Sequence, residues 1–279
     1  MAIFKRKPKD ENTAPKIKTP YKVGLALSGG GARGFAHVGA IKAFEEMGLA
    51  FDCIAGTSAG SFVGAAYAAG ISADEMTEFS KTFADTDIRS KNFLLSASPS
   101  SNIEKVVDRL LQGITFDKLK TPFGAVAVDI LSGEEYIFRE GPVAKAVSAS
   151  CAVPIIFKPV YHEDKVLVDG GLLNTIPADV LRRMGADFVI SVDINSTRGE
   201  GLGTSKLKFL GVAAATWRIV TKTTAYKGQM NSDIMIKPDL TKFKSTNSLG
   251  REEMVEIGYK ATMDAKDEIF YSLCAKPKK

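Results

Sequence analysis

The sequence predicts a single α/β domain with a mainly parallel sheet and helices on both faces. Short apolar runs of strand length alternate with segments of helical periodicity along most of the chain, which is the order that such a sheet requires. No repeat, low-complexity segment or internal linker divides the 279 residues. We therefore expect a basic, disordered lead over residues 1–20 and one domain over residues 21–275.

A glycine-rich loop separates the first expected strand from the first expected helix. Residues 23–28 form a short, largely apolar run, which is typical of a buried strand. The loop follows over residues 29–34, and a helix is expected from about Arg33 to Met47. A second strand should end at a turn over residues 56–60.

The later elements follow from the same periodicities. Ser72 and Glu75 have the spacing of a helix capping box. The pattern over residues 123–138 predicts a hairpin. Further helices and strands are expected over residues 103–111, 143–150, 165–168, 177–184, 188–192, 234–236 and 251–270.

The formal net charge of +5 is concentrated at the amino end. Residues 1–22 hold seven Lys or Arg and two acidic residues, whereas the rest of the chain has 30 of each sign. A neutral body does not predict a nucleic-acid partner. The basic arm is either a solvated tail or a peripheral contact to anionic lipid.

Cysteine usage indicates a reducing compartment. Cys53, Cys151 and Cys274 form no disulfide framework, and the chain offers no zinc-ligand spacing. The amino terminus lacks the apolar stretch of a signal peptide. We therefore expect a cytoplasmic protein without metal or cofactor, with any membrane contact at the inner face.

The most informative motif is a serine between glycines at the second strand end. Gly56, Thr57, Ser58, Ala59 and Gly60 read G-x-S-x-G. The glycines permit a sharp turn that lifts a serine hydroxyl above the end of a sheet. Ser58 is therefore the candidate nucleophile.

A serine nucleophile needs a base. His37 is embedded in the first helix and His162 lies in a polar stretch, so neither falls at a strand end. Asp169 ends the strand over residues 165–168, and Gly170 and Gly171 leave room for close backbone approach. Asp169 is the preferred base, because burial would raise the pKa of its carboxyl group. His162 remains the alternative.

The glycine loop admits two functions. Gly29, Gly30, Gly31, Ala32, Arg33 and Gly34 spell the dinucleotide pattern G-x-G-x-x-G. Asp52 follows at the expected distance but precedes its strand instead of ending it. The same loop could form an oxyanion hole with the N–H groups of Gly30 and Gly31, and that of Ala59 as a third. Arg33 either braces the loop or faces a phosphate head group.

Together these residues resemble the patatin-like phospholipases, in particular the small stand-alone bacterial members. Four blocks stand in the family's order, namely GGGARG at 29–34, GTSAG at 56–60, ASCAVP at 149–154 and DGG at 169–171. The resemblance covers about residues 23–195. It implies a three-layer α/β/α sandwich, a Ser58–Asp169 dyad, an oxyanion hole in the glycine loop and hydrolysis of lipid acyl esters without a metal.

Two departures and two alternatives stay open. Ile155 and Thr175 stand where the family frequently has glycine and asparagine, and either could reshape the acyl pocket. Residues 196–230 have no counterpart, so Phe209, Leu210 and Trp217 either cap the site or pack in the core. The same dyad could transfer the acyl group to an acceptor other than water. The chain could instead bind a dinucleotide or act as a catalytically silent module. No pattern predicts an oligomeric state.

Overall fold

The computed structural model describes residues 19–82, 84–88, 97–195 and 209–274. Most of the lead over residues 1–20, and the loop before the Trp217 helix, lie outside these ranges. The described strands are β1 (Val23–Leu27), β2 (Cys53–Thr57), β3 (Phe123–Asp129), β4 (Glu134–Phe138), β5 (Val160–His162), β6 (Lys165–Asp169), β7 (Phe188–Val192) and β8 (Ile234–Ile236). They form one sheet in the order β5-β6-β3-β2-β1-β7-β8, with β4 also paired to β3.

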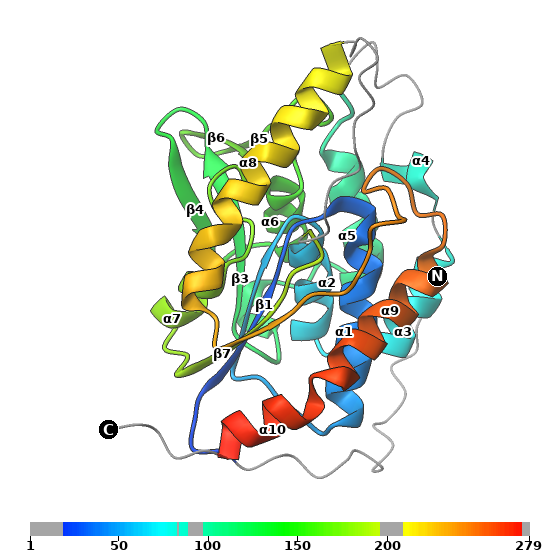
Figure 1. The fold of residues 1–279 in the computed structure, drawn as a ribbon. Helices are drawn as coiled ribbons and strands as arrows, with labels where there is room; N and C mark the ends of the chain where they lie inside the picture. Colours follow the sequence, from blue (N-terminus) through cyan, green and yellow to red (C-terminus); the bar gives the residue numbers. More distant parts are fainter. Residues whose placement is uncertain (1–18, 83, 89–96, 196–208, 275–279) are drawn as a thin grey trace.

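Helices cover both faces of this sheet (Figure 1). They are α1 (Phe35–Glu46), α2 (Ala59–Ala68), α3 (Ala73–Ser80), α4 (Asp85–Ile88), α5 (Ser101–Leu111), α6 (Val143–Ser150), α7 (Ala178–Arg183), α8 (Phe209–Asn231), α9 (Arg251–Asp264) and α10 (Lys266–Cys274), with short 3-10 turns η1 (Gly31–Gly34), η2 (Phe116–Lys118) and η3 (Gly170–Leu172). The predicted capping box is present, since Glu75 Oε2 accepts from the Ser72 N–H at 2.8 Å.

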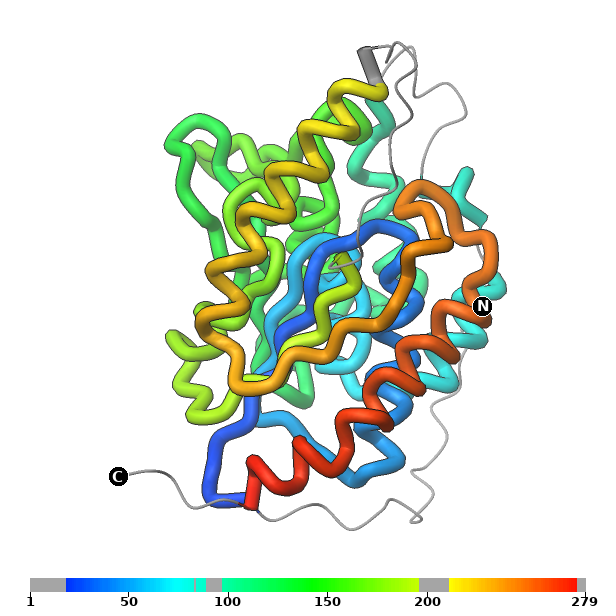
Figure 2. Tube along the Cα trace, in the orientation of Figure 1, coloured from blue at the N-terminus to red at the C-terminus, as the bar shows by residue number. Residues whose placement is uncertain are grey.

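Burial of both faces explains the uninterrupted apolar strands. In β1, Val23, Leu25 and Leu27 enter a large core that α1, α2, α5 and α6 share, whereas Ala26 enters a smaller core with Leu181 of α7. Because successive side chains of a strand point to opposite faces, burial on two sides requires apolar residues at every position. The predicted α/β/α sandwich is confirmed, and Figure 2 shows α8 and the α9–α10 pair on different sides of it.

The sheet is parallel through β3, β2, β1, β7 and β8, whereas β4, β5 and β6 run antiparallel to their neighbours. Two local details differ from the sequence prediction. The final helix is broken at Ala265 into α9 and α10, although neither glycine nor proline marks the break. The three-residue strand β5 is too short to give a recognisable alternation.

One edge of β3 pairs with two strands in succession. β2 pairs in parallel with its first half, and β6 pairs antiparallel with its second half, while β4 occupies the other edge. The last residues of the two strands, Thr57 and Asp169, pair with the adjacent residues Val126 and Ala127. Two carboxyl ends therefore meet, although their strands run in opposite directions.

The uncharged stretch over residues 53–73 contains β2 and α2. None of the described helices is long and apolar enough to cross a membrane.

Candidate active site

Ser58 lies at a strained turn between β2 and α2. Its φ of 52° and ψ of −123° are unusual for a residue with a side chain. A Cβ on Gly60 would lie 2.1 Å from the Leu27 carbonyl oxygen, and one on Gly56 would lie 2.3 Å from the Gly60 oxygen. The turn can therefore close only with glycine at both positions, which is the geometry of a nucleophile elbow.

Ser150 of α6 holds the backbone of the elbow. Its hydroxyl accepts from the Ser58 N–H at 2.9 Å and donates to the Val126 carbonyl at 2.6 Å. It thereby links the turn to β3, the strand on which β2 and β6 meet. Sequence reasoning included Ser150 in the ASCAVP block but assigned it no role, because only the fold brings it to the turn.

Asp169 is buried at the end of β6, with 1% of its surface exposed. Its Oδ1 accepts from the Gly171 N–H at 2.8 Å. Burial raises the pKa of the carboxyl group to about 7, and interactions with the Ser58 hydroxyl and the Gly171 N–H oppose this rise. Oδ2 is buried and has no hydrogen-bond partner among the described residues, so Ser58 and Asp169 do not form a regular hydrogen bond through this atom. Catalytic hydrogen bonds commonly tighten when substrate binds.

The glycine loop lies directly against the elbow. A Cβ on Gly34 would lie 2.9 Å from the Ala59 Cβ, and one on Gly29 would lie 3.5 Å from the Ser58 Cβ. The structure thus brings together the glycine loop, the serine turn and Asp169, which are far apart in the sequence.

The backbone N–H groups of the loop are not equivalent. That of Gly29 donates to Thr175 at 3.0 Å, and that of Ala32 donates to Ser245 at 2.9 Å. Within the described part of the chain, nothing accepts from the N–H of Gly30, Gly31 or Ala59. These three are the donors that the sequence favoured for an oxyanion.

Arg33 links the glycine loop to the segment after β8. Its buried guanidinium donates to the Phe243 carbonyl from Nε at 2.9 Å and from Nη2 at 2.7 Å. A Cβ on Gly31 would lie 2.3 Å from the Ser245 oxygen, so the segment after β8 clamps the loop. Phe243 and Ser245 carry no motif, and nothing in the sequence pointed to them.

Neither histidine is placed as a base. His37 is fully buried, its Nε2 lies 2.8 Å from the Ser28 carbonyl, and burial lowers its pKa to about 4. The expectation that His162 would not fall at a strand end was wrong, since His162 is the last residue of β5. Its Nε2 contacts the Tyr136 hydroxyl at 3.2 Å. It pairs with Lys165, four residues before Asp169 in β6, which corresponds to roughly 13 Å along the strand.

Asp52, the acidic residue on which the dinucleotide hypothesis depends, lies away from the glycine loop. Asp52 lies at the amino end of β2, where its Oδ2 accepts from the Val23 N–H at 2.7 Å. Val23 begins β1, whereas the glycine loop follows the other end of that strand. Asp52 therefore cannot contact a ribose bound at the loop.

Cys151 adjoins the elbow but is chemically inert there. Burial raises the pKa of its thiol to about 12. Its Sγ lies 3.8 Å from the Ser61 hydroxyl. Because only a thiolate is a strong nucleophile, Cys151 does not compete with Ser58.

The turn after Asp169 is packed between β3 and α8. A Cβ on Gly170 would lie 2.3 Å from the Val126 oxygen, and one on Gly171 would lie 3.4 Å from Trp217 Cζ2. Thr175 donates to the Thr221 carbonyl at 2.9 Å, so it ties this region to α8. Trp217 therefore packs on the turn, whereas the side chains of residues 209 and 210 lie outside the described residues.

Ile155 has a left-handed backbone, with φ of 73°, and is 47% exposed. Because a β-branched side chain is strained there, Ile155→Gly should raise the free energy of unfolding by about 1 kcal/mol. Urea denaturation measures this change. Ile155→Ala, which keeps a Cβ, should give a smaller gain, and a destabilised Ile155→Gly would contradict the argument.

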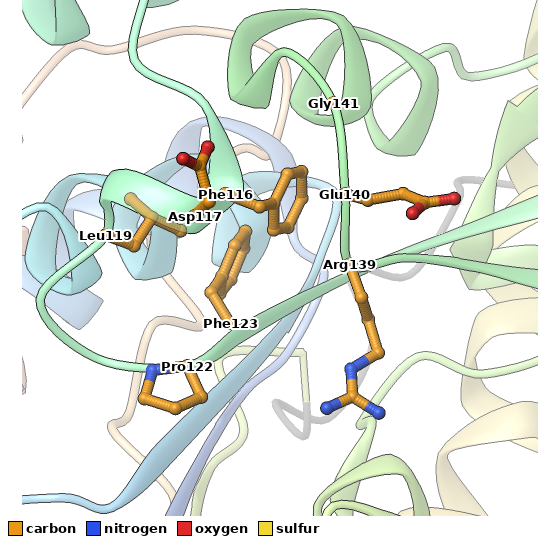
Figure 3. Close-up of a pocket in the computed structure, with 8 residues that line it drawn as sticks. All are labelled: Phe116, Asp117, Leu119, Pro122, Phe123, Arg139, Glu140 and Gly141. Atoms are coloured by element: carbon orange, nitrogen blue, oxygen red, sulfur yellow. The ribbon is translucent and has the colours of Figure 1, made fainter.

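Two surface cavities lie away from these residues. One of about 400 Å³ is lined by the stacked rings of Phe116 and Phe123, with the side chains of Arg139 and Glu140 directed away from them (Figure 3). The other, of about 260 Å³, adjoins His162. Neither cavity is lined by Ser58, Asp169 or the glycine loop.

A serine at a strained strand-to-helix turn, above a sheet between two helical layers, defines α/β proteins with a hydrolase-type nucleophile elbow. The chain belongs to the patatin-like phospholipase family, whose model matches residues 25–182. This confirms the resemblance seen in the four sequence blocks.

Known relatives agree with this membership. An uncharacterised NTE-family protein of Mycobacterium bovis is 36% identical over 180 residues, which cover 63% of this chain and 50% of the relative. Patatin-like phospholipase domain-containing protein 6 of Mus musculus is 31% identical over 204 residues, which cover 70% of this chain and 15% of that protein. The chain thus spans half or less of these curated relatives.

The crystal structure of VipD from Legionella pneumophila shares the fold. It superposes with a TM-score of 0.59 at 16% identity, and covers 95% of this chain and 72% of VipD.

Proposed function

We propose that this protein is a lipid acyl hydrolase that uses Ser58 as nucleophile and Asp169 as general base. Ser58 attacks the ester carbonyl and Asp169 accepts its proton. The N–H groups of Gly30, Gly31 and Ala59 hold the oxyanion. Asp169 returns the proton to the leaving alcohol, and water then releases the acid from the acyl-enzyme.

The observation that carries the proposal is the end-to-end meeting of β2 and β6 on one edge of β3. This meeting of strand ends supports a pairing of the Ser58 hydroxyl with a carboxyl group whose pKa burial raises to about 7. A base with a pKa near the working pH is both ionised and proton-accepting. Membership of the patatin-like phospholipase family supports a lipid ester as substrate.

A panel of lipid classes tests this function. Phospholipids, lysophospholipids, acylglycerols and a short soluble ester are each incubated with the protein and with Ser58→Ala, and the released fatty acid is quantified. Release by the wild type alone, together with fluorophosphonate labelling that requires Ser58, supports the proposal. Added alcohols separate hydrolysis from acyl transfer, since a transferase would form a new ester.

Hydrolysis of the soluble ester is expected to lose rate as the pH falls through about 7, the pKa of Asp169. Below that pH the carboxyl group is protonated and cannot accept the serine proton. The dependence of kcat/KM on pH, measured with an uncharged substrate, should show one acid limb. His37, with its pKa near 4, cannot produce a limb near 7. A rate that stays constant well below pH 6 would exclude Asp169 as the base.

A further inference from the structure

The outward face of α8 carries large apolar side chains in a regular row. Val212, Ile219, Tyr226 and Met230 are exposed by 51%, 65%, 65% and 68%. Thr216 and Thr223, both exposed, complete the spacing of alternating four and three residues. Since three to four residues make a helical turn, these six side chains form one stripe, the α8 row.

Apart from Trp217, which packs on the turn after Asp169, the inward face of α8 carries small or polar side chains. Thr224 donates to the Gly171 carbonyl at 2.9 Å, and the carbonyl of Thr221 accepts from Thr175 at 2.9 Å. Gly228 packs so closely that a Cβ there would lie 2.3 Å from the Ile176 oxygen. An ordinary surface helix points its apolar side chains inward. In α8, four large apolar side chains point outward instead, so this outer face is available to a partner outside the fold.

The charge of α8 defines the chemistry of that partner. Between residues 209 and 231 the sequence has Arg218, Lys222 and Lys227 and no acidic residue. At 100° per residue, Lys222 and Lys227 lie on the two flanks of the α8 row. Lys227 bonds to Glu135 and Asp179, whereas Lys222 is an exposed cation with no ion pair among the described residues. A basic helix with an apolar outer face is complementary to an anionic lipid surface.

We propose that the α8 row docks this protein on the surface of an anionic lipid bilayer. The row lies in the plane of the interface, with Lys222 on its flank directed to the head groups. The same helix contacts the turn after Asp169, so docking would bring the candidate active site close to the bilayer. This inference rests on the proposed function only for the role of docking, which is access to a lipid substrate. Binding to the bilayer does not itself require catalysis.

Cosedimentation with vesicles tests the proposal. The full chain should bind vesicles of phosphatidylcholine with phosphatidylglycerol more tightly than vesicles of phosphatidylcholine alone, and salt should weaken the difference. The triple variant Ile219→Ser, Tyr226→Ser, Met230→Ser should bind about tenfold more weakly or worse. The matched control Leu249→Ser, Tyr271→Ser removes apolar side chains that are 78% and 80% exposed elsewhere, and should bind as the wild type does.

Two activity measurements separate this inference from the proposed function. The triple variant should hydrolyse a short soluble ester at the wild-type rate and lose activity only on vesicles. Ser58→Ala should bind vesicles normally whether or not Ser58 is the nucleophile. Both results would support docking through α8.

Three results would overturn the proposal. Equal vesicle binding by the triple variant and the wild type would remove α8 from the contact. If deletion of residues 1–18 abolished vesicle binding while the triple variant still bound as the wild type does, the contact would belong to the basic arm. Conversion of a stable oligomer into a monomer by the triple variant, with vesicle binding unchanged, would make the α8 row an interface between copies of this chain.

Discussion

Ser58→Ala is expected to lower ester turnover by a factor on the order of 10⁶. The substitution removes the proposed nucleophile, and the neighbouring Cys151 cannot replace it because burial raises the pKa of its thiol to about 12. Single-turnover and steady-state assays on the soluble ester measure the loss. Fluorophosphonate labelling should disappear with it.

The fold of Ser58→Ala should be unchanged, because the elbow is held through the Ser58 backbone N–H and the Ser150 hydroxyl. Circular dichroism and the urea midpoint check this. Ser80→Ala, which removes a buried hydroxyl that bonds to the Thr77 carbonyl within α3, is the matched control and should keep the soluble-ester activity. Turnover by a folded Ser58→Ala at the wild-type rate would refute the nucleophile.

Asp169→Asn is expected to reduce kcat by about 10²–10⁴-fold, the usual contribution of a general base. The amide is nearly isosteric and its oxygen can still accept from the Gly171 N–H, but it cannot take the serine proton. The residual kcat/KM of Asp169→Asn should no longer fall as the pH drops through about 7. His162→Ala should stay active, because His162 lies far along β6 from the site. A folded but inactive His162→Ala would restore histidine as the base.

Asp169→Asn should not lower the free energy of unfolding at pH 8. The folded-state pKa of Asp169 is about 7, against 3.8 for the free group. A raised carboxyl pKa means that folding disfavours the ionised form, so stability falls as the pH rises from about 4 to about 7 and then levels off. Asp169→Asn has no charge to bury. Its urea midpoint at pH 8 should equal or exceed that of the wild type, which separates its loss of activity from any loss of structure.

The sequence could predict the elbow, the loop and the strand that delivers Asp169, because each depends on local rules. A sharp turn requires Gly56 and Gly60, and a strand buried on both faces requires the apolar run of β1. The motif order then indicated the family, and the family implied the sandwich. All of these signals lie within a few residues of the feature that they predict.

The direction of β6 could not be predicted in this way. In a fully parallel sheet, Asp169 would reach the site because the carboxyl ends of parallel strands share one edge. β6 is antiparallel, and Asp169 reaches the site only because β6 continues where β2 ends. Strand direction depends on long-range pairing, and a short apolar run is compatible with either direction.

The supports around the site were also invisible in the sequence. Ser150, Phe243 and Ser245 act through a hydroxyl or a carbonyl oxygen, and every residue has a carbonyl. Their roles come from position alone. The outward direction of the apolar row on α8 could be recognised only when the contacts to Thr175 and Gly171 identified the inward face of this helix.

The backbone of β3 sets the separation between the two proposed catalytic groups. Val126 and Ala127 are consecutive, so the separation of hydroxyl and carboxyl is fixed by a single peptide unit. An insertion between them would displace one group by about 3.3 Å and turn it toward the opposite face of the sheet. An added or lost residue in this short stretch of β3 would therefore separate Ser58 from Asp169 even where the elbow and the glycine loop kept their sequences.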